Sequence, residues 1–331
     1  MPEPVTYRAV LCEALGPIEG LKLVRLARPP LSPKSVRLAV KAAGLNFPDL
    51  LMIQGLYQHR PPLPFVPGLE AAGIVTEVAS DVSPVAVGDR VMAQMRTGAY
   101  AEEAVVAADQ VRPLPPGFTF AEAATFLVAH LTAYHALSTR ADLKAGQSLL
   151  VVGAAGGVGL AAVEIGKVLG ARVIAAASSP DKLAAARCKG ADHVIDYTSE
   201  PIEAAVGRAT GGLGADVVFD PVGLAPVAGL RCLAWNGKLL IVGFSAGAIP
   251  QYAANRILLR GASVIGVRAG EAGRRDPALR QRELAALAAL ANGGRARPLV
   301  SADFALAEFA AALRLMAERR AIGRVALLTA P

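Results

Sequence analysis

The stretch VVGAAGGVG, residues 151–159, decides the fold. It continues an apolar run that begins at Ser148, and it opens a helical pattern over residues 158–169 with Gly170 at the position of a C-terminal cap. A strand, a turn with the spacing G-x-x-G-x-x-G and a helix form a pyrophosphate-binding unit, because glycines let phosphates approach the backbone and the helix N-terminus offers free N–H groups. The alternative is a flexible turn that binds no ligand.

Strand and helix patterns alternate along the chain after this turn, which favours the dinucleotide-binding interpretation. Short apolar runs separated by helical patterns are typical of a doubly wound parallel sheet. The six expected strands are Ser148–Val152, Arg172–Ala177, His193–Asp196, Asp216–Asp220, Lys238–Gly243 and Ser263–Val267. We therefore predict an α/β protein with a Rossmann dinucleotide-binding domain over residues 125–296.

The first 120 residues have a different sequence pattern, with short apolar runs between prolines and glycines and few helical patterns. The pattern predicts a β domain. After the linker-like pair Arg297-Pro298, the tail contains an Ala-rich helix to Arg320 and a strand at 323–328. We expect this tail to rejoin the β domain, which would then comprise residues 1–124 and 297–331.

Composition narrows the classes of function. The formal charge of +7 suits an anionic ligand, but the basic residues are scattered and form no long run, so nucleic acid is not predicted as a partner. The longest uncharged stretch, residues 145–163, is broken in its middle by the four glycines of the turn, so no membrane span is expected. Three dispersed cysteines offer neither a disulfide framework nor a metal knuckle, which favours a cytoplasmic protein.

The end of the second expected strand bears on the choice of cofactor. An NAD site would place an acidic residue there for the ribose hydroxyls, but this chain has Ala177-Ser178-Ser179. Lys182 and Tyr197 follow nearby, so a 2′-phosphate would meet hydroxyl groups and a cation. We predict NADPH. In the alternative interpretation, Ser179 caps a helix and Lys182 is merely solvated.

Further motifs lie in the first domain: AAGLNFPD (42–49), GLY (55–57), PGLEAAG (67–73), GDRV (88–91) and GAYAE (98–102). With these motifs the whole chain resembles the medium-chain dehydrogenase/reductase superfamily, and its zinc-free quinone oxidoreductase (zeta-crystallin-like) family in particular. The resemblance implies a GroES-like β domain, a Rossmann domain and a C-terminal segment that returns to the first domain.

The resemblance also implies that zinc is absent. Zinc-dependent members of the superfamily have a Cys and a His where this chain has Asn46 and Leu69, and the four-Cys loop of their structural zinc is missing. His130 and His135 are interpreted as structural residues of a helix near the domain junction. No metal ligand is predicted.

Site residues are carried over from the family one by one. The resemblance implies that Asn46 and Tyr57 face the nicotinamide and the substrate, whereas the alternative for Tyr57 is packing of a loop on Pro61 and Pro62. The other implied cofactor-binding residues are Thr132, Gly156, Gly157, Val158, Gly159, Ser178, Lys182, Tyr197, Val242, Gly243, Phe244, Val267 and Arg324. An Arg at position 268, where relatives often carry aromatic residues, leaves the shape of the nicotinamide-side pocket open.

The implied activity is metal-free hydride transfer from NADPH to a quinone, which depends on positioning the two reactants. The first alternative is an enone or alkenal reductase, with acyl-CoA substrates included, which also needs a proton donor. The second is a relative that binds a nucleotide or RNA without turnover. The expected site shows no His–carboxylate pair, and the apolar last strand of the sheet predicts a homodimer.

Overall fold

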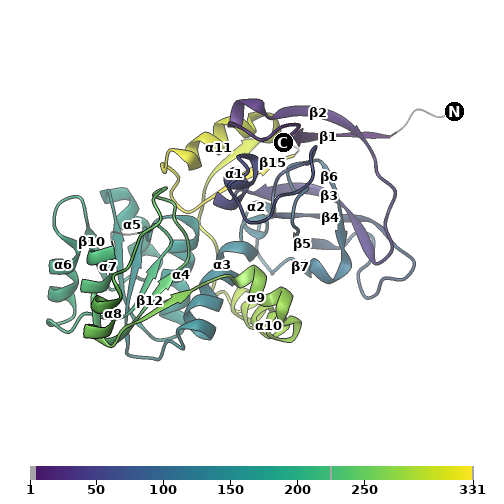
Figure 1. The fold of residues 1–331 in the computed structure, drawn as a ribbon. Coiled ribbons are helices and arrows are strands. Elements are labelled where there is room, and N and C mark those ends of the chain that lie inside the picture. Colours follow the sequence, from purple (N-terminus) through teal and green to yellow (C-terminus); the bar gives the residue numbers. More distant parts are fainter. Residues whose placement is uncertain (1–4, 224–225, 330–331) are drawn as a thin grey trace. The chain divides into compact units, whose positions relative to one another are not determined.

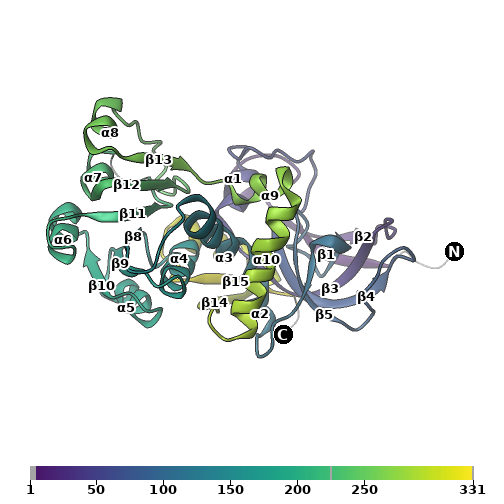
Figure 2. The same cartoon turned by 90° about the horizontal axis from the view of Figure 1, so that it is seen from below.

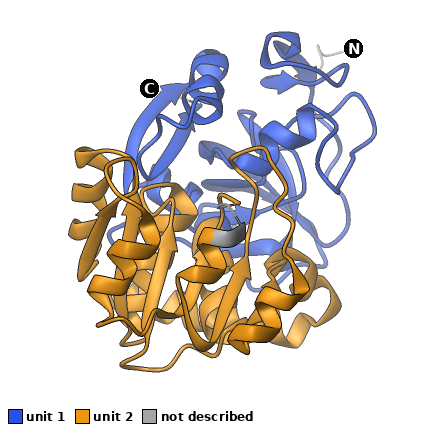
Figure 3. Ribbon diagram, turned by 60° about the vertical axis from the view of Figure 1, so that its left-hand side comes forward, with its two compact units in different colours: residues 1–128, 299–331 blue, residues 129–298 orange. Residues whose placement is uncertain are grey.

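The computed structural model describes residues 5–223 and 226–329. The chain forms two compact units, shown in two colours in Figure 3: unit 1 comprises residues 1–128 and 299–331, and unit 2 comprises residues 129–298. Each unit has a sheet and helices of its own, so the two are described separately.

Unit 2 is built on a six-stranded parallel sheet with the order β10-β9-β8-β11-β12-β13 (Figure 2). The strands are β8 (Ser148–Val152), β9 (Arg172–Ala177), β10 (His193–Asp196), β11 (Ala215–Asp220), β12 (Leu233–Ile241) and β13 (Ser263–Gly266). The order reverses between β8 and β11, which creates the crevice where such sheets bind ligands. The predicted doubly wound fold is confirmed.

Helices flank this sheet on both faces. The helices are α3 (Leu127–Tyr134), α4 (Gly157–Val168), α5 (Pro180–Cys188), α6 (Ile202–Ala209), α7 (Pro226–Arg231), α8 (Ala254–Arg260), α9 (Ala269–Arg275) and α10 (Pro277–Asn292). Helix α4 contacts β8, β9 and α5, whereas α6 contacts β9, β10 and α7. All five residues of β8 are buried, because a central parallel strand is covered on both faces.

Unit 1 is rich in strands (Figure 1). A seven-stranded sheet has the order β14-β15-β3-β4-β5-β7, with β6 also paired to β3, and β1 and β2 form a separate ribbon. The strands are β1 (Thr6–Leu11), β2 (Lys22–Ala27), β3 (Ser35–Gly44), β4 (Glu70–Val78), β5 (Arg90–Gln94), β6 (Glu103–Ala107), β7 (Val111–Pro113), β14 (Val300–Ala305) and β15 (Arg324–Leu328). Its helices are α1 (Phe47–Ile53), α2 (Phe120–Ala124) and α11 (Phe309–Ala317).

The C-terminal tail returns to unit 1, where β15 lies between β14 and β3. Leu327 of β15 is opposite Ala43 of β3, and both are fully buried. Strand β14 was not expected from the sequence, which predicted only a connecting segment there. It is an edge strand with alternating exposure, and only one neighbour holds it in the sheet.

Candidate functional site

The glycine-rich turn joins β8 to α4 and has the geometry that a pyrophosphate requires. Gly153 has a positive φ of 59°. A Cβ on Gly159 would overlap the carbonyl oxygen of Gly153 and lie 2.9 Å from Cα of Ala154. Gly156 is the N-cap of α4, and no side chain caps the helix. The first-turn N–H groups, including those of Gly157 and Val158, therefore lie beside a backbone that a phosphate can approach closely.

The ends of β9 and β10 bring three predicted residues close together. Lys182 Nζ donates to Ser178 Oγ at 3.2 Å, and the Tyr197 N–H donates to the carbonyl of Ala177 at 3.2 Å. Ser179 caps α5, as one interpretation of the sequence held, but Lys182 also reaches back to the strand end. Hydroxyl and ammonium groups thus cluster there, and no carboxylate stands at positions 177–179.

The carboxyl ends of β11, β12 and β13 are aligned by hydrogen bonds beyond the strands. The Val242 N–H donates to the backbone carbonyl of Asp220, and the Val267 N–H donates to the backbone carbonyl of Ile241, each at 2.9 Å. Buried Asp220 accepts two backbone N–H groups of the following turn through Oδ1. Gly243 and half-exposed Phe244 follow Val242, so these predicted residues share one sheet edge with the glycine turn.

Asn46 lies in a buried polar cluster of unit 1. Its Nδ2 donates to Glu70 Oε1 at 3.1 Å and to the carbonyl of Gly44 at 3.3 Å, while Oδ1 accepts from Arg324 Nη2 at 2.9 Å. Arg324 also forms an ion pair with Glu70. Asn46 is 3% exposed and Arg324 7%. Both hydrogens of the Asn46 side-chain amide are therefore bonded within unit 1, and the Arg324 guanidinium is paired to the Glu70 carboxylate.

Asp49 and Tyr100 extend this cluster. The Tyr100 hydroxyl and the Asn46 backbone N–H donate to Asp49 Oδ2 at 2.7 and 2.8 Å, while Oδ1 has no hydrogen-bond partner among the described residues. Burial raises the pKa of Asp49 to about 7, in spite of these donors. Burial also raises the pKa of Tyr100, and the adjacent Asp49 charge raises it further. Asp49 is thus a carboxyl group that takes up its proton near neutral pH.

Tyr57 and Thr132 belong to different units. Tyr57 follows α1, is partly buried and packs against the hydrophobic core of unit 1. Thr132 lies in the unit 2 part of α3 and is also partly buried. The structure therefore gathers the pyrophosphate and adenosine-side residues in unit 2, with Asn46, Tyr57 and Arg324 in unit 1.

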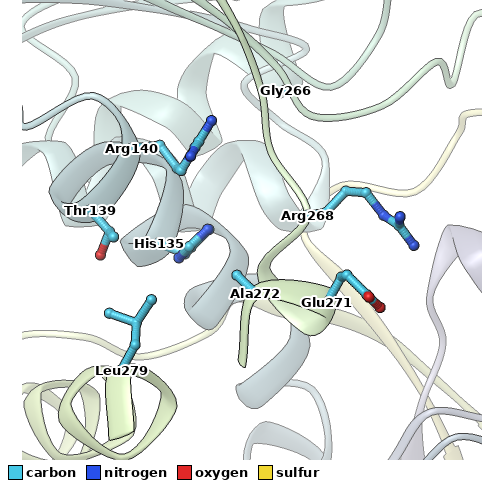
Figure 4. Close-up of a pocket in the computed structure, with 8 residues that line it drawn as sticks. All are labelled: His135, Thr139, Arg140, Gly266, Arg268, Glu271, Ala272 and Leu279. Carbon is cyan, nitrogen blue, oxygen red and sulfur yellow. The ribbon is translucent and has the colours of Figure 1, made fainter. Parts of the chain in front are cut away.

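A cavity of about 370 Å³ opens in unit 2 at the carboxyl end of β13 (Figure 4). It is lined by His135, Thr139, Arg140, Gly266, Arg268, Glu271, Ala272 and Leu279. His135, Thr139 and Arg140 come from a π-helical segment, His135–Arg140, that continues α3. Such segments are rare and occur often at functional sites.

Two His–carboxylate pairs were not predicted from the sequence, which indicated none at the expected site. His135 Nδ1 is 2.8 Å from Glu283 Oε1, and His130 Nε2 is 3.0 Å from Glu164 Oε2. Burial opposes ionisation of Glu164, but the His130 hydrogen bond and the Lys189 charge leave its pKa below the ordinary value. The partners are 148 and 34 residues apart, so no local pattern reveals them.

Among the described residues, no group of three or more His, Cys, Asp or Glu side chains is arranged to hold a metal ion. The same part of the chain contains no helix long and apolar enough to span a membrane. Cys12, Cys188 and Cys232 are all unpaired thiols.

Two family models match the chain. Residues 32–116 match the alcohol dehydrogenase GroES-like domain, and residues 157–295 match the model described as zinc-binding dehydrogenase. A GroES-like domain joined to a Rossmann sheet defines an oxidoreductase fold of the medium-chain dehydrogenase/reductase superfamily.

Comparison with known proteins indicates which branch of this superfamily the chain resembles. The chain is 38% identical to the quinone oxidoreductase-like protein 2 homolog of Nematostella vectensis, over 98% of this chain and 89% of that protein. It is 36% identical to quinone oxidoreductase-like protein 2 of Bos taurus, over 97% and 92%. The chain therefore belongs to the medium-chain dehydrogenase/reductase superfamily, among proteins named quinone oxidoreductase-like, and is an NAD(P)-dependent oxidoreductase.

Solved structures agree with this assignment. A probable oxidoreductase from Mycobacterium abscessus is 39% identical, with a TM-score of 0.89 over 98% of this chain and 99% of that chain. The Escherichia coli quinone oxidoreductase complexed with NADPH is 29% identical, with a TM-score of 0.89 over 97% and 99%. The fold and the resemblance to quinone oxidoreductases of the medium-chain dehydrogenase/reductase superfamily, both predicted from the sequence, are thus confirmed.

Proposed function

We propose that this protein reduces quinones with NADPH, by hydride transfer and without a metal. The observation that supports this most directly is the pairing of Lys182 with Ser178 at the end of β9, where an NAD-binding protein would carry an acidic residue. When bound, the cofactor would supply the hydride. The protein's part is to bind the cofactor, orient the acceptor and exclude water.

The proposed binding residues fit NADPH by chemistry. Gly156, Gly157, Val158 and Gly159 would hold the pyrophosphate at the N-terminus of α4. Ser178, Lys182 and Tyr197 would hold the 2′-phosphate. Thr132, Val242, Gly243, Phe244 and Val267 would contact the nicotinamide half, and Arg324 would contribute from β15 while it stays paired to Glu70.

Asn46 and Tyr57 are the proposed substrate-side residues. To donate to a substrate carbonyl, Asn46 would have to give up its bond to Gly44, the longer of its two at 3.3 Å. We expect Asn46 to act chiefly by shape and orientation. The Tyr57 hydroxyl is the proposed hydrogen-bond donor to a bound quinone.

The test is oxidation of NADPH at 340 nm with a panel of quinones and enones, with and without a chelator. We expect quinone turnover that chelation leaves unchanged. Tyr57→Phe should lower quinone turnover by less than about tenfold, because only one hydroxyl is lost, but lower enone turnover by up to ~10²-fold. Loss of quinone turnover in Tyr57→Phe with intact NADPH binding would contradict a mechanism based on positioning.

Enone or alkenal reduction, acyl-CoA substrates included, is the second candidate. It is favoured by the presence of groups that can carry a proton, because an enone needs one at its α-carbon after hydride addition. A nucleotide- or RNA-binding protein without turnover is the remaining alternative, and activity with any acceptor would exclude it. We also propose a cytoplasmic location, which three unpaired thiols favour.

A further inference from the structure

Hydride addition to a quinone or an enone leaves an anion that must take up a proton. Asp49 and Tyr100 in unit 1 can hold a proton, but both are completely buried. In unit 2, the imidazole of His135 is 2% exposed and forms part of the wall of the cavity at the end of β13. It therefore differs from Asp49 and Tyr100 in lining a cavity, although its ring is almost as deeply buried.

Glu283 holds this imidazole in one orientation. Its Oε1 lies 2.8 Å from His135 Nδ1 and also accepts the Thr139 hydroxyl at 2.6 Å. Glu283 is 4% exposed. Because a buried carboxylate needs donors, the network assigns the proton to Nδ1. A carboxylate behind a histidine fixes its tautomer and stabilises the imidazolium form, as in acid–base catalysis generally.

The second ring nitrogen, Nε2, is the free end of this pair. Among the described residues, Nε2 has no hydrogen-bond partner. It is also absent from the set of unpartnered polar atoms that are completely buried. Figure 4 shows the ring between Thr139, Arg140 and the chain that leads from Gly266 to Ala272. Nε2 can therefore exchange a proton with the cavity while Nδ1 stays bonded to Glu283.

The cavity adjoins the residues proposed for the nicotinamide half. Gly266 and Arg268 line it, and Val267, a proposed cofactor contact, stands between them in the chain. Thr132, another proposed contact, precedes His135 by three residues, about one helical turn. The His135 ring thus lines a cavity whose other lining residues, Gly266 and Arg268, flank a residue proposed to bind the nicotinamide half.

Other charged groups also face the cavity. Arg140 and Arg268 are exposed, and in Figure 4 their guanidinium groups point away from the ring. The carboxylate of Glu271 is bonded to Arg275 and Arg274, which lower its pKa to about 2. Among the described residues, Glu283 is thus the one charged group hydrogen-bonded to the imidazole.

We infer that His135 supplies the proton that completes the reduction, with Glu283 and Thr139 as its positioning residues; the inference rests on the proposed reductase function. The cofactor, when bound, would supply the hydride, and Nε2–H supplies the proton that the reduced acceptor takes up by way of water in the cavity. The oxyanion of a quinone, or the α-carbon of an enone, receives that proton. The neutral imidazole then regains a proton from solvent.

A first test needs no turnover. Imidazole ¹⁵N spectra of the protein without cofactor, assigned with single variants of its four histidines, report tautomer and titration. We expect His135 to keep a proton on Nδ1 and to gain and lose one at Nε2. Glu283→Gln should mix the tautomers. A His135 ring that does not titrate, or one with Nδ1 unprotonated, would overturn the inference whatever the activity.

The second test compares two matched histidines. His135→Asn keeps a side-chain N–H for Glu283 but removes Nε2. His130→Asn alters the His130–Glu164 pair, whose histidine is equally buried and which does not line the cavity. For wild type, enone kcat/KM should fall at high pH as the donor form is lost. His135→Asn should lower enone kcat/KM at low pH about 10²-fold and remove its dependence on pH. Turnover of a simple quinone should fall by less than about tenfold. His130→Asn should keep the wild-type profile.

The outcomes separate the two proposals. If wild type reduces enones and His135→Asn keeps its profile, the inference is wrong and the proposed function stands. If wild type reduces neither quinones nor enones, the proposed function fails, and the inference about proton supply fails with it. Should His135→Asn not fold, Glu283→Gln replaces it. We expect this variant to lower enone kcat/KM about tenfold and to shift the pH at which kcat/KM falls. An unchanged pH dependence in Glu283→Gln would also overturn the inference.

Discussion

Lys182 is the residue on which the proposed cofactor preference depends most. Its ammonium group lies 3.2 Å from the Ser178 hydroxyl at the end of β9. A charge-assisted contact to a phosphate contributes roughly 1.5–3 kcal/mol, so Lys182→Ala should weaken NADPH binding about ten- to a hundredfold and spare NADH. Fluorescence titration with both cofactors measures this, and equal wild-type affinities for the two would contradict the assignment of Ser178, Lys182 and Tyr197.

Asp49 predicts a pH dependence of stability. Burial raises its pKa from 3.8 to about 7 in the folded protein, so the folded state binds this proton more tightly than the unfolded state does. The associated stabilisation is complete below about pH 4 and is lost as pH rises through about 7, with a magnitude of about 4 kcal/mol.

Asp49→Asn cannot ionise, and its amide oxygen can still accept from Tyr100 and the Asn46 backbone. The variant should therefore show a smaller decline in unfolding free energy between pH 5 and pH 7.5 than wild type. Urea denaturation at the two pH values measures the difference. Equal declines in both proteins would mean that Asp49 keeps an ordinary pKa.

At the scale of elements, the β8–α4 turn is predicted not to tolerate a side chain at position 159. Gly159→Ala would place a methyl group against the backbone of Gly153 and Ala154, so we expect lost stability and lost cofactor binding. Gly207 in α6 is the control, because its Cβ would meet no atom within 4 Å and alanine is the better helix former by about 1 kcal/mol. Thermal unfolding and NADPH titration should show damage in the first variant and slight stabilisation in the second.

Elements with a strong local pattern could be predicted from the sequence, and those fixed by distant contacts could not. Four of the six strands of the parallel sheet begin at the residue expected, because buried parallel strands are continuous apolar runs. Strand β12 begins at Leu233 rather than Lys238, since Leu233 pairs with Ala215 of β11 across an irregularity in register that includes the left-handed Asn236. The His135–Glu283 pair joins two distant helical segments, so only the folded chain brings it together.

At the scale of the whole molecule, we expect a homodimer. Strand β13 is an edge strand of the described sheet, and nearby Trp235, Leu258 and Leu259 are 70%, 78% and 75% exposed. Apolar residues beside a bare strand edge favour pairing with a second copy. The alternative is that the chain's own loops shield the edge.

Light scattering at micromolar concentration should give twice the monomer mass. Changing Leu258 and Leu259 together to Lys should yield monomers, while Leu213→Lys, at an equally exposed leucine between α6 and β11, should leave the dimer intact. A monomeric wild-type protein would contradict the expectation.

The return of the tail to unit 1 has a consequence for biosynthesis. Unit 2 is one continuous stretch of chain, so it can fold on the ribosome as soon as residue 298 has left the exit tunnel. Unit 1 must wait for β15, which inserts between β3 and β14 and brings the Arg324 cation to Glu70 and Asn46. Until then the nascent chain has an open flank on β3 and a carboxylate without its counter-ion, so a stalled or truncated product is the form that chaperones and proteases should capture.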